Sequence, residues 1–254
     1  MESIRTPFQG VWNIVRFNWH FYLAAFFAVS LLIASSIYLP QALSYLTLFL
    51  SVVVVCLSIT SLLVSYFVYD LSKLYSLDWL SESKADSKSE IVNIHSGFDE
   101  TSALLTQKFP YSKLTVFDFY DPSIHTEVSI KRARKAYPQF QGTQSIDATS
   151  IPLTDNSTDV VFLLLAAHEI RNHDERITFF KEINRILKED GRVIVTEHLR
   201  DTANFLAYNL GAFHFYSKRS WLDCFAKTGF NVISEAKLTP FISKFTLEKN
   251  GIPR

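Results

Sequence analysis

Hydrophobic and polar residues are distributed very unevenly along this chain of 254 residues. Residues 19–39 and 42–69 are two almost uninterrupted apolar runs separated by Pro40 and Gln41. A helix needs about 20 residues to cross the roughly 30 Å hydrocarbon core of a bilayer. Tryptophan and tyrosine lie near the ends of the runs, where interfacial aromatic residues belong. The pattern predicts a transmembrane helical hairpin over residues 19–69.

Two other interpretations of the apolar runs remain open. A cleaved signal peptide would have a shorter apolar core and one run rather than two. A hairpin buried in a large core would need a larger soluble part to cover both helices. For a membrane hairpin, the basic residues Arg5 and Arg16 before it and Lys73 and Lys84 after it place both ends in the cytoplasm. We therefore expect a membrane protein with two spans and a cytoplasmic catalytic domain.

The same pattern divides the chain into four segments. Residues 1–18 are a cytoplasmic N-terminus, residues 19–69 the hairpin, residues 70–89 a connector, and residues 90–254 a soluble domain. The connector is amphipathic, with apolar residues at helical spacing. It is expected either to lie along the membrane surface or to cap the domain.

Strand-like and helix-like segments alternate from residue 90 onward. The strand-like runs are residues 91–97, 113–121, 144–153, 158–170, 192–198, 231–238 and 243–250, and the helix-like runs are residues 99–109, 127–137, 174–190 and 217–230. Gly191 and Gly229 are expected to end the last two helices. The alternation predicts βαβ units and an α/β fold with a doubly wound sheet. In such sheets, ligands bind outside the carboxyl ends of the strands.

Charge and cysteine content limit the function classes. The 25 basic and 25 acidic residues give a net charge of zero, so no nucleic-acid partner is expected. Cys56 lies in an apolar run and Cys224 in a helix-like run, which makes a disulfide between them improbable. Neither cysteine has metal-ligand spacing, and we expect no metal site.

One long segment carries a family resemblance. Residues 147–198 read DATSIPLTDNSTDVVFLLLAAHEIRNHDERITFFKEINRILKEDGRVIVTEH. The acid before the IPL turn, the DVV strand and the EINRILKEDGR helix and turn resemble the class I S-adenosylmethionine-dependent methyltransferases. The IRN at 170–172 and Glu197 are similar to the ubiquinone/menaquinone C-methyltransferase branch (methyltransferase type 11). The resemblance covers about residues 69–249, and its second half is the specific one.

The resemblance implies a Rossmann-like sheet with S-adenosylmethionine as cofactor, and in this chain the two predicted transmembrane helices precede that sheet. It places Asn93, His95 and Gly97 in the cofactor loop after the first strand. The family has an acid and three glycines there, whereas this chain has an amide at position 93 and keeps only the middle glycine. Asp147 stands where the family has an acid that contacts adenine, with Ala148 beside it.

Asp118 ends the second strand-like run about 20 residues after the loop. An acid at this place can hydrogen-bond the ribose hydroxyls of a nucleotide cofactor. A nicotinamide-binding domain would also have an acid at this place to bind a ribose, but the pattern after residue 145 favours the methyltransferase.

A polar cluster of His168, Glu169, Arg171 and His173 follows the fourth strand-like run. In this family, that position lies over the transferred methyl group. Orientation and proximity supply most of the catalysis of methyl transfer, and a base is needed only where the acceptor loses a proton. His168 or Glu169 could serve as that base, with Arg171 beside them. In the alternative reading, His168 faces the helix beneath and the others begin a solvated helix. Further candidates are Glu197, His198 and His214.

Two more segments bear on the substrate. Residues 202–221 are rich in aromatics and could line an apolar acceptor pocket, dip into the bilayer or simply pack in the core. The aromatic candidates are Phe205, Tyr208, Phe213, Phe215 and Tyr216. The basic run KRARK at 131–135 is expected to be a solvated helix face rather than a lipid headgroup site.

These features predict a membrane-anchored methyltransferase that acts on a lipophilic small molecule, such as a quinone-like, aromatic-polyene or lipid acceptor. The anchor could equally serve a membrane protein partner, and homo-oligomers remain open. The alternatives are a non-catalytic scaffold protein with the same fold and a nicotinamide-dependent oxidoreductase. The altered glycine loop motivates the first of these.

Overall fold

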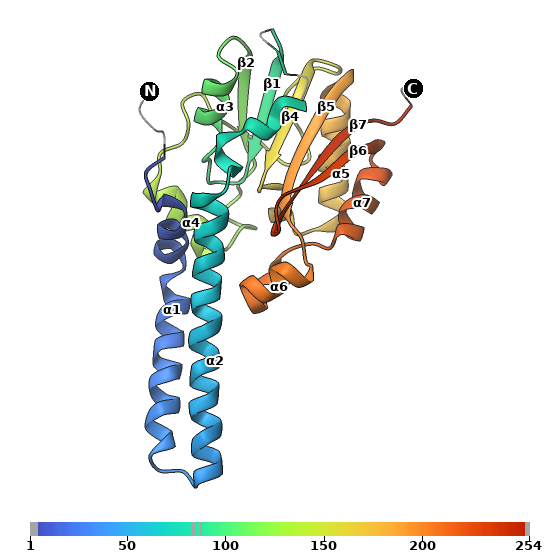
Figure 1. Ribbon diagram of the computed structural model, residues 1–254. Helices are drawn as coiled ribbons and strands as arrows, with labels where there is room; N and C mark the ends of the chain where they lie inside the picture. The colour runs from blue at the N-terminus through green and yellow to red at the C-terminus, as the bar shows by residue number, and fades with distance from the viewer. Residues whose placement is uncertain (1–4, 83–84, 87, 252–254) are drawn as a thin grey trace.

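The soluble part of the chain is built on one mixed β-sheet. The computed structural model describes residues 5–82, 85–86 and 88–251, and within these residues seven strands follow the order β3-β2-β1-β4-β5-β7-β6. The strands are β1 Glu90–His95, β2 Lys113–Asp118, β3 Gln144–Ser145, β4 Thr158–Leu164, β5 Leu187–His198, β6 Phe230–Thr239 and β7 Ile242–Lys249. Strands β1 to β5 are parallel, and β7 is antiparallel to both of its neighbours. The predicted α/β class, the doubly wound sheet and the final pair of strands are confirmed (Figure 1).

Helices cover both faces of this sheet. On one face, α5 (His173–Ile186) and α7 (Lys218–Lys227) bury an aromatic cluster that includes Phe180, Trp221 and Phe225. On the other face lie α3 (Ser102–Lys108) and two short helical turns of the connector, η2 (Leu74–Ser76) and η3 (Asp78–Glu82).

The connector is part of the core of this second face. Leu77 and Leu80 are fully buried there against Ile91, Phe162 and other apolar residues of the strands. The connector therefore caps the domain, which is one of the two arrangements expected for it.

The helix before β5 ends earlier than the sequence predicts. Gly191 was expected to end a helix over residues 174–190, but α5 ends at Ile186 and Gly191 lies inside β5. Leu187 is fully buried and already extended, because it pairs with Thr158 of β4. Gly191 is needed for close approach: a Cβ there would lie 2.8 Å from the Leu187 side chain and 2.9 Å from the Asp159 carbonyl oxygen. Gly229, in contrast, follows α7 with a φ of +79°, as predicted for a helix-ending glycine.

The two apolar runs form two long helices that project from the domain (Figure 1). They are α1 (Gln9–Ser36) and α2 (Gln41–Tyr66), joined at Pro40. Helix α1 begins about ten residues before the predicted span and is interrupted at Asn18, where φ is −116° and ψ is 19°. Residues 9–17 pack on the domain, and only the part beyond Asn18 projects. Residues 9–18 of the predicted N-terminal segment thus belong to α1, whose buried residues Gly10, Asn13 and Phe17 lie in this part.

The carboxylate of Asp70 fixes the beginning of α1. It accepts hydrogen bonds from the backbone amides of Gly10 (2.7 Å) and Val11 (2.8 Å), which have no partner within the helix. Asp70 belongs to η1 (Phe67–Leu71), a helical turn that continues α2. A Cβ at Gly10 would lie 2.4 Å from the Cβ of Tyr69, so only glycine allows the two segments to meet this closely.

Side chains of the domain hold the rest of this docked helix. The Tyr137 hydroxyl donates to the Asn13 amide oxygen at 2.9 Å, and the Phe17 ring packs edge-on against the rings of Phe98 and Tyr137. Arg132 of α4 (Val128–Ala136) donates to the Phe17 carbonyl at the interruption of α1.

Candidate active site

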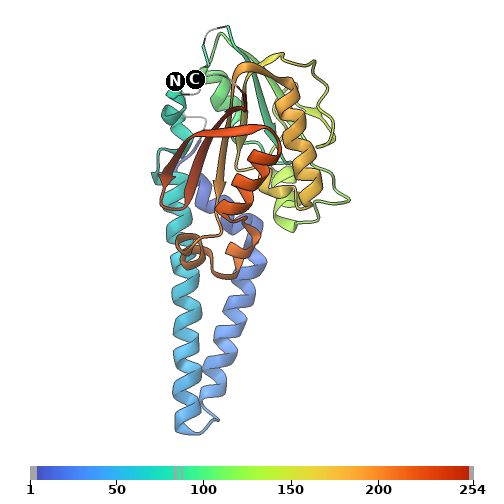
Figure 2. The ribbon, with the colours of Figure 1, turned by 90° about the vertical axis from the view of Figure 1, so that its right-hand side faces the viewer.

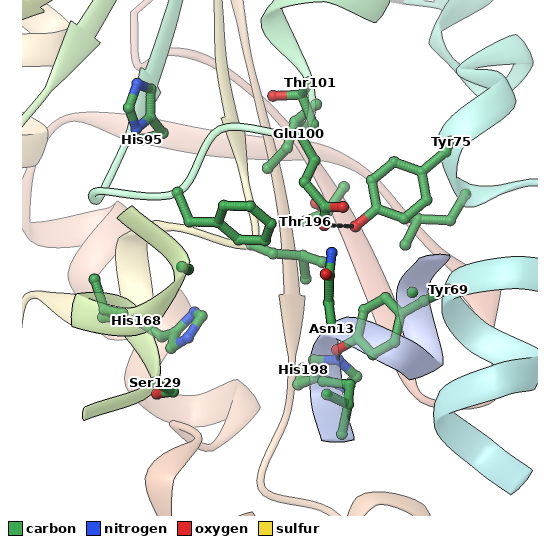
Figure 3. A pocket seen from close by; sticks show the side chains of 18 of the residues that line it. Asn13, Tyr69, Tyr75, His95, Glu100, Thr101, Ser129, His168, Thr196 and His198 are labelled. Carbon is green, nitrogen blue, oxygen red and sulfur yellow. Dashed lines mark hydrogen bonds between the residues drawn. The ribbon is translucent and has the colours of Figure 1, made fainter. Parts of the chain in front are cut away.

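A cavity of about 270 Å³ lies over the carboxyl ends of β1, β4 and β5, where the order of the strands reverses. This is the place at which doubly wound sheets bind their ligands. One wall is made by strand-end residues, including His95, His168 and His198. The opposite wall comes from the N-terminal helices, including Asn13 and Tyr69 (Figure 3).

The N-terminal wall is linked to the strand ends by specific polar contacts. The Tyr69 hydroxyl lies 2.8 Å from Nε2 of His198, and the Tyr75 hydroxyl donates to Glu100 at 2.8 Å. Arg5 pairs with the same Glu100 carboxylate and stacks on the Tyr75 ring. The hairpin and the sheet thus enclose one site.

The loop after β1 has the shape of a cofactor loop. Gly97 has a φ of +76°, the left-handed conformation that favours glycine. Asn93 is buried, and its amide nitrogen donates to the hydroxyls of Thr101 and Ser102 at the start of α3. The amide that replaces the family's acid therefore positions the loop.

Several polar atoms of this loop are buried without a hydrogen-bond partner among the described residues. They are Asn93 Oδ1, both ring nitrogens of His95, Ser96 Oγ and Asp99 Oδ2. A buried polar atom without a hydrogen bond is costly. His95 lines the cavity, and its two ring nitrogens lie 3.9 Å from Asp99 and 3.7 Å from Asp118, so they can receive a polar ligand there. Burial lowers the pKa of His95, although Asp99 and Asp118 nearby oppose this, so its ring is neutral at pH 7.

Asp118 lies at the end of β2 beside the loop, but it does not line the cavity. Its side chain is 1% exposed, and its Oδ1 accepts from the backbone amide of Gly97 at 2.7 Å. Its Oδ2 accepts from Gln139 at 3.1 Å and pairs with Arg134 of α4. A ribose hydroxyl would have to displace one of these two side chains.

The predicted adenine-side residues also lie outside the cavity. Asp147 is exposed, and its carboxylate accepts from the backbone and hydroxyl of Thr149, which lowers the pKa of Asp147. Ala148 is buried in the core of the sheet.

The predicted catalytic cluster is partly assembled in the cavity. His168 and Glu169 lie on η4 (Ala167–Glu169), directly after β4. Nδ1 of His168 lies 2.7 Å from the buried Glu197 carboxylate, and its Nε2 lies 3.3 Å from Glu169. His214 approaches the same Glu169 oxygen to 3.7 Å.

The charges of this cluster influence one another. Burial alone would lower the pKa of His168, but the carboxylates of Glu197 and Glu169 outweigh it and raise the pKa well above the usual value. Burial would raise the pKa of Glu169, but the His168 and His214 rings outweigh it and lower that pKa.

The arginines of the predicted cluster and of the basic run hold other parts of the chain in place and do not line the cavity. Arg171 donates to the backbone carbonyls of His214 (2.6 Å) and His168 (3.2 Å), so it ties the loops on either side of the cluster together. The run 131–135 is not simply a solvated face as expected, because Arg132 holds α1 and Arg134 holds Asp118.

The sequence analysis did not predict the cavity wall formed by Asn13, Tyr69 and Tyr75. These residues lie in or beside the apolar runs and come from two distant parts of the chain. The available signal was the presence of polar residues at positions 13 and 18 within a segment with helical spacing.

Comparisons with known proteins agree with this geometry. Residues 93–195 match the family model Methyltransf_11, a methyltransferase domain, whereas no curated protein matches significantly. A SAM-dependent methyltransferase from Methanosarcina mazei is 14% identical with a TM-score of 0.52, and the match covers 68% of this chain and 97% of that one. A SAM-dependent methyltransferase from Aquifex aeolicus is 16% identical with a TM-score of 0.50, covering 70% and 93%.

The fold is therefore that of the S-adenosylmethionine-dependent methyltransferases, and the family match assigns a methyltransferase domain to the centre of the chain. The similarity of residues 93–195 to a methyltransferase domain, on the fold of the S-adenosylmethionine-dependent methyltransferases, agrees with the expectation of S-adenosylmethionine as cofactor. The unpartnered polar atoms of residues 93–99 and the positive φ of Gly97 fit such a group.

The pairing of Asp118 with Arg134 makes a prediction about cofactor affinity. Asp118→Asn removes the charge and should weaken S-adenosylmethionine binding at least about tenfold, since hydrogen bonds to charged groups contribute about 1.5–3 kcal/mol. Arg134→Ala frees one oxygen of Asp118 and should bind the cofactor at least as tightly as the native chain. Calorimetric titration measures both, with the exposed Lys135→Ala on the same helix as control. Equal weakening by Arg134→Ala would show that Arg134 itself contacts the cofactor.

His198 makes a prediction about stability and pH. Its ring is buried between the Tyr208 and Phe215 rings, and its Nδ1 donates to the Asn204 amide oxygen, which leaves Nε2 to accept from Tyr69. Burial is the largest cause that lowers the pKa of His198, to about 4. The charge of His168 contributes to this lowering, and that of Asp201 acts to raise the pKa.

Below pH 6.5 the unfolded chain binds a proton at His198, whereas the folded chain remains neutral down to about pH 4. The free energy of unfolding should therefore fall by about 3 kcal/mol from this group as the pH decreases across that interval. Chemical unfolding at a series of pH values should show a shallower dependence for His198→Gln. Parallel curves for the variant and the native chain would contradict the assignment.

Proposed function

We propose that this chain is a membrane-anchored methyltransferase whose acceptor is a lipophilic small molecule that enters the site from the lipid interface. The observation that carries this proposal is the shared cavity. Gly10, Asn13 and Phe17 of α1 line it together with the ends of β1, β4 and β5. The helices that would enter the bilayer thus form a wall of the site.

The exposed surface of the hairpin supports the anchor. Both helices are long and apolar enough to cross a membrane, and only 6% of each apolar window is buried. Large side chains such as Phe26, Leu31 and Phe49 lie on the surface. Such helices are not the core of the domain, and burying their apolar surface in lipid removes it from water.

The docked start of α1 argues against a signal peptide that is removed. Gly10, Asn13 and Phe17 are buried against the domain, so cleavage after the first apolar run would take away part of the cavity wall. With Arg5, Arg16 and Lys73 at the domain end of the hairpin, the proposal places the domain on the cytoplasmic side. Lys84, which supported the same orientation, lies outside the described residues.

A second apolar surface faces the same direction as the hairpin. It lies on α6 (Thr202–Tyr208) and η5 (Asn209–His214), beside α2 in both views (Figures 1 and 2). Its exposed residues are Phe205 (47%), Leu206 (65%), Leu210 (79%) and Phe213 (57%). Exposed apolar side chains beside α2, next to the domain end of the hairpin, can insert into the membrane interface. Phe215, which follows directly, lines the cavity, so this surface leads from lipid to the site.

The site residues have distinct roles in this proposal. When bound, the cofactor supplies an electrophilic methyl group. His168 and Glu169 act on the acceptor: they face the cavity and orient its reacting atom. Glu197 fixes the His168 ring, and Arg171 is a positioning residue that holds the loop.

The experiment uses the full chain in lipid nanodiscs with methyl-labelled S-adenosylmethionine and a total lipid extract as acceptor source. Label should pass into the organic phase. Ser129→Trp, which places a large ring in the cavity wall, should reduce this transfer at least about tenfold, whereas Lys131→Trp on the exposed face of the same helix should leave it unchanged. Label found only in water-soluble products, with the lipid fraction unlabelled, would refute the lipophilic acceptor.

A further inference from the structure

We propose that His168, Glu169 and His214 form a binding site for a divalent transition-metal cation at the edge of the cavity. Nε2 of His168 lies 3.3 Å and Nε2 of His214 lies 3.7 Å from the same carboxylate oxygen of Glu169. One ligand atom from each residue lies within 4.8 Å of the other two. This proposal stands independently of the acceptor and of the membrane anchor.

The hydrogen bonds behind the two imidazoles prepare them as ligands. Nδ1 of His168 lies 2.7 Å from Glu197, and Nδ1 of His214 lies 3.1 Å from Glu127. A carboxylate at Nδ1 holds the proton on that nitrogen, so Nε2 is the nitrogen that releases its proton when a cation binds. Metal-ligating histidines almost always have such a partner on their second nitrogen. Here both histidines have one, and both Nε2 atoms converge on one carboxylate.

The spacing of the three ligand atoms suits a small cation. Nitrogen and oxygen ligands lie about 2.0–2.2 Å from zinc, which places neighbouring ligands of a tetrahedral site about 3.4 Å apart. The two distances to the Glu169 oxygen, 3.3 and 3.7 Å, are close to this value. The rings of His168 and His214 cross at 84°, so their edges approach Glu169 from different sides.

The charge of the cluster also favours a cation. Three carboxylates, from Glu127, Glu169 and Glu197, surround two imidazoles. The guanidinium groups of Arg171 and Arg176 touch these loops, and they bond to the backbone carbonyls of His168, His214 and Ile170. Among the described residues, neither forms an ion pair with these carboxylates. A divalent cation on Glu169 would balance carboxylate charge that is otherwise held in a poorly solvated place.

Two imidazoles and one carboxylate form a ligand set that suits zinc, iron(II) and cobalt(II). Three protein ligands leave further coordination positions vacant, and because His168 and Glu169 line the cavity, these positions face its interior. An oxygen of an acceptor could occupy one of them. With a cation in place, the three side chains would orient the acceptor oxygen through the cation rather than directly.

No ligand spacing in the sequence predicts this site, and the expectation of no metal was based on the two cysteines. His168 and Glu169 follow β4, whereas His214 ends the short helix η5 after β5. The loops come together because Arg171 bonds to the His214 carbonyl and because the Tyr216 hydroxyl donates to the Arg171 carbonyl at 3.0 Å.

The test is calorimetric titration of the full, tag-free, chelator-treated chain in detergent with zinc, together with the visible absorption spectrum of its cobalt(II) complex. We expect one zinc per chain. His214→Ala should weaken zinc binding about a hundredfold or more, and Glu127→Gln, which leaves all three ligands in place, should weaken it about tenfold. His173→Ala, an exposed histidine near the same loop, is the matched control and should bind normally.

Absence of stoichiometric zinc binding to the native chain would overturn the proposal, as would equal affinity of the native chain and His214→Ala. Equal affinity of the native chain and Glu127→Gln would do the same, because it would show that the carboxylate behind His214 does not prepare it as a ligand. Thermal unfolding of the cation-free variants separates loss of the ligand from loss of the fold. S-adenosylmethionine titration of the same samples keeps this result apart from the methyltransferase assignment, since a chain can fail either test and pass the other.

Discussion

The hydrogen bonds from the Gly10 and Val11 amides to the Asp70 carboxylate are the constraint on which the arrangement of the molecule depends. They join the start of α1 to the end of α2, so the two apolar helices leave the domain as one unit. The same junction places Asn13 and Tyr69 over the strand ends. This contact between segments about 60 residues apart therefore acts on both the position of the hairpin and the shape of the cavity, together with the bonds of Asn13, Phe17 and Tyr69 to the domain.

The site inside this junction contains two chemically different halves. On the β1 side, several buried polar atoms of residues 93–99 have no hydrogen bond to the part of the chain that the structure describes, as expected where a polar cofactor completes the hydrogen bonding. On the β4 and β5 side, His168, Glu169 and His214 are held by carboxylates and by Arg171. The apolar residues of α6 and η5 lie next to this second half. In our proposal, a polar cofactor and a lipophilic acceptor thus approach from opposite sides.

The sequence predicts the features that depend on local pattern. The alternation of strand-like and helix-like segments predicts the α/β class of the sheet, and the length of the apolar runs predicts the two long helices. The polar cluster after β4 is also predicted, because its residues directly follow a strand-like run. The prediction that Gly191 ends a helix was wrong. A glycine after an amphipathic helix usually ends that helix, but here Leu187 already pairs with β4, so the helix ends before it. The pairing of Asp118 with Arg134 and the approach of His214 to Glu169 depend on tertiary contacts that no spacing encodes. The N-terminal wall escaped prediction for the same reason.

The central claim is that the start of α1 is a wall of the site in the membrane-bound protein. The most direct measurement replaces Phe17 by the photoreactive residue p-benzoylphenylalanine and identifies its crosslinks in native membranes. Because the Phe17 ring lies 5.7 Å from the Phe98 ring and 6.2 Å from the Tyr137 ring, we predict adducts with peptides that contain these residues. The same label at Phe26, which is 64% exposed, should give lipid adducts. Lipid adducts alone at position 17 would contradict the account.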